Sequence, residues 1–191
     1  MATDPASQAR LAGVVLAVGL ALAACGDSKA TAAEAAASET AHTVCSMLRD
    51  WSNELSASAN ETASSITDDD DPATANDVLA DGLEDLIDLA GDHVAAVESL
   101  DLPATRERDR LLDDLRTGAG AAVEVLEGER GDVAALPPIT VERQRGAIGG
   151  LFVALEGAHA AVEPPVGSYD DETLRRAFAD DEGCTHVVQP F

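Results

Sequence analysis

The stretch DVLADGLEDLIDLAGDHVAAVESL, residues 77–100, decides the fold of this chain. Apolar residues recur along it every three or four positions, so they line one face of a helix, and acidic residues occupy the opposite face. A helix of this kind must bury its apolar face against other elements, which predicts a helical bundle. The apolar face comprises Leu79, Leu83, Leu86, Ile87, Ala90, Val94 and Val97, and the acidic face comprises Asp81, Glu84, Asp85, Asp88 and Asp92.

Similar patterns flank this stretch on both sides. The preceding helix carries a single apolar stripe from Val44 to Leu55, and the acidic run at 68–71 with Pro72 ends it. Short, proline-marked connections predict antiparallel neighbours. We therefore expect an all-α fold, an antiparallel bundle of about four main helices plus a short C-terminal helix. The helices are expected at about 44–66, 74–102, 104–128, 140–163 and 170–181.

Local signals predict the helix ends. Thr74 or Asn76 is expected to cap the second helix and Ser168 the short C-terminal one, while Gly183 suits the position just after that helix. The run AIGGLFVAL, residues 147–155, is apolar on every side and predicts a fourth helix enclosed by the others.

The composition of the chain limits the classes of molecule that the protein is expected to bind. The formal net charge is −24, which repels nucleic acid and anionic lipid headgroups and instead attracts cations, basic peptides or basic proteins. The alternative is that the acidity only keeps the domain soluble or suits a salty habitat. Aromatic residues make up only 3% of the chain against 46% hydrophobic residues, so the core must be built from small and aliphatic side chains. This composition favours helices over a β-sandwich or a barrel.

The N-terminus has the pattern of an export signal. Arg10 precedes an uncharged apolar run, Leu11–Ala24, which is shorter than the about 20 residues that a membrane span requires. The run ends in Leu22-Ala23-Ala24-Cys25, which resembles the lipobox of bacterial lipoproteins. Eleven arginines against one lysine, together with the alanine-rich signal, resemble actinobacterial lipoproteins in particular.

The lipobox resemblance implies a signal peptide over 1–24 and a lipidated Cys25 that carries fatty acyl chains of the palmitate type. Residues 25–41 are then a flexible tether and 42–191 the bundle domain, held at the extracytoplasmic face of the cell membrane. The alternative is an ordinary signal peptide in which Cys25 is incidental.

Lipidation of Cys25 leaves two cysteines, Cys45 and Cys184. Outside the cytoplasm such a pair usually forms a disulfide, which here links the start of the domain to its end. The alternative is a cysteine-based metal or redox site, but the sequence lacks the C-x-x-C spacing typical of one.

The sequence contains only weak candidates for metal ligands. Glu156 and His159 have the Glu-x-x-His spacing of di-iron helical bundles, but the second copy is missing because Ala90 stands three residues before His93. His93 and His159 occupy equivalent places in a faint repeat, and their imidazoles would approach each other if the second and fourth helices were parallel neighbours. The alternative is that each histidine only complements the C-terminal end of its helix. We expect no resident metal or cofactor.

No nucleophile motif such as G-x-S-x-G is present, so an enzyme is not expected. The sequence favours a non-enzymatic binding or interaction module at the cell envelope. The alternative is a metal- or small-ligand-binding lipoprotein that delivers cargo to a membrane transporter; a carboxylate-based envelope hydrolase ranks third. The glycines of the fourth helix either allow close packing or leave a cavity for an apolar ligand, with Trp51 and Phe152 as walls: Gly146, Gly149, Gly150 and Gly157.

Overall fold

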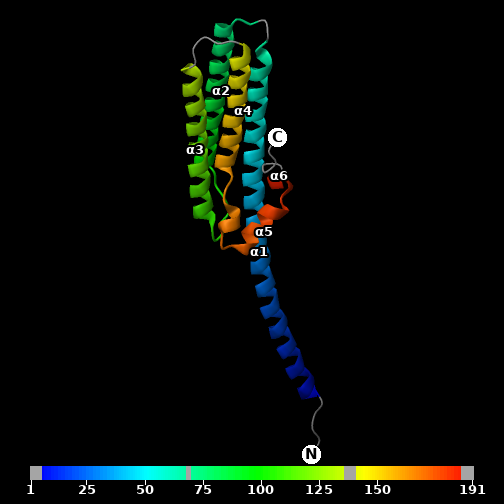
Figure 1. The fold of residues 1–191 in the computed structure, drawn as a ribbon. Helices are drawn as coiled ribbons and strands as arrows, with labels where there is room; N and C mark the ends of the chain where they lie inside the picture. The colour runs from blue at the N-terminus through cyan, green and yellow to red at the C-terminus, as the bar shows by residue number, and fades with distance from the viewer. Residues whose placement is uncertain (1–5, 68–69, 136–140, 186–191) are drawn as a thin grey trace, which may run out of the picture.

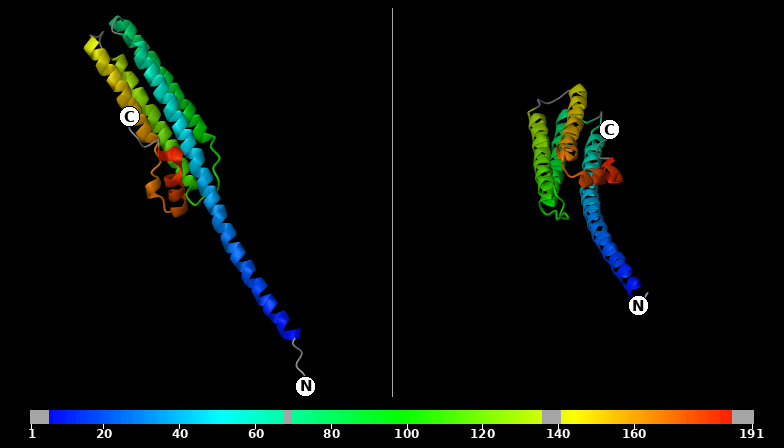
Figure 2. Two further views of the ribbon diagram at one scale, coloured as in Figure 1. Left: turned by 90° about the vertical axis from the view of Figure 1, so that its right-hand side faces the viewer. Right: turned by 90° about the horizontal axis from the view of Figure 1, so that it is seen from below.

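The computed structural model describes residues 6–67, 70–135 and 141–185, and every regular element in them is a helix (Figure 1). Four long helices pack side by side, each antiparallel to the one before it, and a short C-terminal segment folds back against the first (Figures 1 and 2). The predicted all-α bundle is confirmed. The elements are α1 (Ala6–Ser65), α2 (Pro72–Glu98), α3 (Arg108–Ala134), α4 (Val141–Val162), the 3-10 turn η1 (Val166–Ser168), α5 (Glu172–Asp180) and α6 (Glu182–Thr185).

The core is aliphatic, as the composition predicts. Leucine, alanine and valine supply most of its buried side chains, and Trp51, Tyr169 and Phe178 are its fully or nearly buried aromatic residues in the described part of the chain. The acidic face of α2 is exposed along its length, including Asp92 next to the buried His93. Burial of the apolar stripes therefore holds the four long helices together.

Helix ends differ from the sequence predictions. Asp71, not Thr74 or Asn76, caps α2: its carboxylate accepts the backbone N–H groups of residues 73 and 74, at 3.0 and 3.1 Å. Pro72 fits the first turn because a proline there sacrifices no helical hydrogen bond. Asp171 caps α5 in the same way, because the predicted cap Ser168 belongs to the preceding turn.

The prediction that α4 is enclosed on all sides is wrong, since Val153 is 68% exposed. Each helix of an antiparallel bundle keeps one face toward solvent, even where that face carries an apolar residue. Two of the four α4 glycines are closely packed as predicted: a methyl group on Gly150 or Gly157 would meet the side chain of Glu129 or Val125 of α3, whereas Gly146 and Gly149 face open space. The close approach to a neighbouring backbone lies on α3, where a methyl group on Gly118 would collide with the carbonyl oxygen of Ala161.

The packed part of α1 begins before the predicted boundary at His42. Ala37, Thr40 and Ala41 are already buried, because α5 packs against this part of α1 and extends the core. The predicted tether at 25–41 is thus helical, with exposed side chains at 31–35. The preceding part of α1 projects beyond the bundle (Figure 2). Over the described residues, no helix carries a stretch long and apolar enough to cross a membrane.

Candidate functional site

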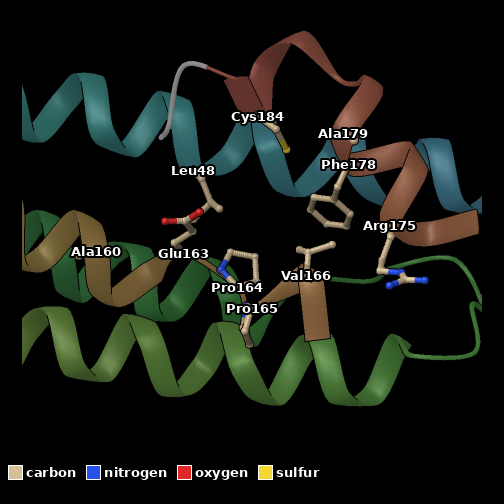
Figure 3. Close-up of a pocket in the computed structure, with 11 residues that line it drawn as sticks. Leu48, Ala160, Glu163, Pro164, Pro165, Val166, Arg175, Phe178, Ala179 and Cys184 are labelled. Atoms are coloured by element: carbon tan, nitrogen blue, oxygen red, sulfur yellow. The ribbon is translucent and has the colours of Figure 1, made fainter. Parts of the chain in front are cut away.

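A pocket of about 600 Å³ lies at the seam between the bundle and the C-terminal cap, by which we mean residues 164–185. Its volume falls in the range typical of small-molecule sites. Leu48 of α1 and Phe178 of α5 point into it from two sides, and Val166 and Pro164 approach from a third (Figure 3). The lining is mainly apolar.

The sequence after α4 explains why this space exists. Pro164 and Pro165 begin two residues after the last residue of α4 and cannot continue the helix, so the chain turns away through η1 before α5 returns to α1. Leu174 and Phe178 are buried on the inner face of the amphipathic α5 and attach it to α1. Three of the residues that line the remaining gap are too small to fill it: Ala160, Gly167 and Ala179.

Polar contacts attach the cap to α3. The hydroxyl of Tyr169, a residue only 1% exposed, donates a hydrogen bond to Asp114 Oδ2 at 2.9 Å, and Arg110 lies 4.8 Å above the tyrosine ring. Burial, and secondarily the Asp114 carboxylate, raises the pKa of Tyr169 far above its usual value, so the phenol stays protonated. Arg110 also donates to Ser168 Oγ at 2.8 Å. These contacts hold the η1 wall of the pocket in place.

Two charged side chains lie at opposite ends of the pocket, Glu163 and Arg175 (Figure 3). The Arg175 guanidinium pairs with Glu172 through one terminal nitrogen, and its buried Nε–H has no hydrogen-bond partner among the described residues. The Arg175 side chain is 40% exposed, so its guanidinium is accessible to an acceptor atom on a molecule bound at this end of the pocket. The Glu163 carboxylate is exposed and suited to a donor.

The two cysteines meet at one edge of the pocket. Cys45 and Cys184 form a disulfide across 139 residues of sequence, with Cα atoms 4.9 Å apart, and Cys184 lines the pocket. Gly183 lies close to Cys45, where a β-carbon would crowd both Cys45 and the Asp181 carboxylate. Gly183 therefore serves close packing; it does not adopt a left-handed C-terminal cap, since no residue in the described part of the chain has a positive φ.

The two histidines singled out from the sequence lie beside Trp51. His93 stacks on the indole with ring centroids 4.6 Å apart, and His159 meets it edge-on at 5.6 Å. The Oγ of Ser52 lies 3.2 Å from His159 Nε2. Burial lowers the pKa of His93 to about 4 and also lowers that of His159, so both rings are neutral at pH 7. Both rings thus pack against the same indole, one stacked and one edge-on.

The weak metal candidates do not converge. Glu156 is exposed, whereas His93 is 4% exposed, and neither belongs to a group of metal-ligating side chains in the described residues. In the described residues, the metal-ligating side chains that do lie close together are those of Cys45, Asp181 and Cys184. The side chain of Cys25 lies outside the described residues.

Comparison with family models, curated proteins and solved structures yields no significant match. Function must therefore be argued from this chain's own residues.

Proposed function

We propose that this protein is a lipid-anchored, extracytoplasmic binding protein that holds a mainly apolar small molecule in the pocket at the seam between bundle and cap. The lipobox-like sequence ending at Cys25 supports the anchor. The pocket, with its apolar walls and two charged ends, supports a small ligand over a purely protein-binding module. A carrier that passes such cargo to a membrane transporter fits this arrangement. No bond-breaking step is proposed.

The charges around the pocket restrict the ligand. A net charge of −24 disfavours an anion, and the guanidinium of Arg175 is already paired with Glu172. A neutral acceptor such as an ester or amide carbonyl suits the partly exposed guanidinium of Arg175, which lines the pocket. A hydroxyl or amine suits the Glu163 end. We propose an elongated apolar molecule with an acceptor at one end and a donor at the other.

Native mass spectrometry of residues 26–191 tests the ligand. This fragment keeps the whole described core, whose buried residues run from Ala37 to Gly183. We expect a stoichiometric apolar adduct that is lost in Ala160→Phe and Ala179→Phe, which fill the pocket. Ala96→Phe, at an exposed position of α2 outside the pocket, serves as the matched control. An adduct that survives both filling variants would place the ligand elsewhere.

The anchor is tested separately with the full chain in an actinobacterial host. We expect wild type in the membrane fraction with acyl chains on the N-terminal cysteine, and Cys25→Ser without them. Ser28→Ala, a neighbouring change outside the lipobox-like motif, should behave as wild type. Wild-type protein found unacylated and fully secreted would favour the ordinary signal peptide.

A second proposal is docking of a basic protein or envelope component, which the net charge of −24 favours. Binding to such a partner should weaken steeply as salt rises, because exposed charges are screened over about 8 Å at physiological ionic strength. Salt-independent binding would count against it.

A further inference from the structure

Four potential metal ligands surround the disulfide between α1 and α6. His42 and Cys45 stand three residues apart on α1, and Asp181 and Cys184 stand three residues apart around the start of α6. Two intervening residues between paired ligands is a spacing common in structural zinc sites. Each chain segment thus contributes one sulfur atom and one nitrogen or oxygen atom.

In the structure, the side chains of these four residues lie close together. One ligand atom each from Cys45, Asp181 and Cys184 lies within 4.8 Å of the others, and no other such group of three occurs in the described residues. His42 Nδ1 lies 3.4 Å from Asp181 Oδ2, so the imidazole borders the same group.

The surroundings suit a bound cation. The backbone N–H of Gly183 donates to Asp181 Oδ1 at 2.8 Å, which orients the carboxylate and leaves Oδ2 toward His42. Hydrogen bonds of this kind hold metal ligands in position. Cys45 is fully buried and the Asp181 side chain is 16% exposed, whereas His42 is 75% exposed and its ring can reorient. The cluster of these four side chains therefore has a buried side, at Cys45, and a solvent-exposed side, at His42, through which a metal ion can enter.

We propose that reduction of the Cys45–Cys184 disulfide converts this corner into a Zn²⁺ site with Cys45, Cys184, Asp181 and His42 as ligands. A small-molecule or protein dithiol supplies two electrons and two protons; its own thiols become a disulfide as the protein disulfide becomes two thiols. Zn²⁺ then replaces the two thiol protons, which pass to solvent, and the carboxylate and neutral imidazole complete a tetrahedral set. In both states α6 stays joined to α1.

Cobalt titration of residues 26–191 tests this site, since Co²⁺ bound to thiolate absorbs strongly in the near ultraviolet. After reduction with a phosphine, we expect this absorption to saturate at one Co²⁺ per chain and to disappear when Zn²⁺ is added. The oxidised protein should show none. Asp181→Asn and His42→Ala should each weaken Co²⁺ binding by roughly tenfold or more. Asp180→Asn, an exposed neighbouring change, should bind as wild type.

Circular dichroism of the reduced protein runs alongside the titration. If helical signal falls on reduction, Zn²⁺ should restore it. The proposal is overturned if the reduced protein shows no cobalt–thiolate absorption, if both ligand variants bind as tightly as wild type, or if lost helical signal does not return with Zn²⁺. Cys184 belongs both to the proposed metal site and to the pocket lining, whereas Asp181 does not line the pocket; Asp181→Asn should therefore weaken metal binding and leave the pocket ligand bound, which distinguishes the two proposals.

Discussion

The four-helix bundle and the C-terminal cap are held by different forces. The bundle depends on continuous burial of leucine, alanine and valine stripes along its helices. The cap has one amphipathic helix of nine residues, and its attachment relies on discrete links: the disulfide to α1, the Tyr169–Asp114 hydrogen bond and the contacts of Arg110. The pocket lies where the two meet.

This difference indicates where ligand exchange would occur. Losing one contact in the bundle weakens a cooperative core, whereas losing one link in the cap can open the pocket while the bundle stays folded. Variants that act on one region only can test the comparison.

Cys184→Ser should have the largest effect and act on the cap. Removing the link across 139 residues should destabilise the protein by about 2–4 kcal/mol and lower the melting temperature by roughly 5–15 °C. Helical signal at 25 °C should persist, while binding of a fluorescent apolar probe to the pocket is lost. The measurement is thermal melting of residues 26–191 with a chelator present. An unchanged melting temperature would mean that the disulfide does not hold the cap.

Acid should weaken the bundle through His93. Its pKa is about 4 in the folded protein against 6.5 for the free group, so the unfolded chain binds the proton more readily. The stability that the neutral, buried His93 contributes is fully present above pH 6.5 and is lost as the pH falls toward 4, by roughly 3 kcal/mol at most.

The check is denaturant unfolding of wild type and His93→Phe at several pH values, followed by fluorescence of Trp51, the protein's single tryptophan. Wild type should lose stability relative to the variant between pH 6.5 and 4. Because carboxylates also titrate there, the difference between the two proteins is the informative quantity. Parallel pH profiles would contradict the assignment.

Gly118→Ala should destabilise the bundle by about 1–2 kcal/mol, because the added methyl group meets the backbone of α4 and the clash outweighs the gain in helix propensity. Gly120→Ala in the same helix is the matched control. That position is exposed with no neighbour within 4 Å, so alanine there should stabilise by up to about 1 kcal/mol. Urea unfolding measures both, and equal effects would remove the argument for a close α3–α4 approach.

Tyr169→Phe should have the smallest effect, about 1 kcal/mol, because it removes one hydrogen bond from the cap. Faster amide hydrogen exchange is expected in α5 but not in α2. Asp113→Asn, at an exposed position of α3, should leave exchange in α5 unchanged. If α2 and α5 accelerate equally in Tyr169→Phe, the cap does not open independently.

The sequence predicted the helices far better than the site. Apolar spacing located the four main helices and cysteine counting paired Cys45 with Cys184, both of which the structure bears out. The pocket was missed, because it arises from small residues on elements that only tertiary packing brings together. The proposed Zn²⁺ site does have a signal in the sequence, the spacing of two residues between His42 and Cys45 and again between Asp181 and Cys184. A C-x-x-C pattern does not contain this signal, because each pair combines a cysteine with a histidine or an aspartate.

What the sequence alone determined is therefore what neighbouring residues decide: helical periodicity, proline-marked ends, charge, and the uncharged apolar run before Cys25. Tertiary structure decided which faces meet. It packed both His93 and His159 against one indole, and it left a gap where α5 returns to α1. The reason is physical: a hydrogen-bonded helix is specified within a few residues, whereas a site built from segments more than a hundred residues apart depends on how whole helices pack.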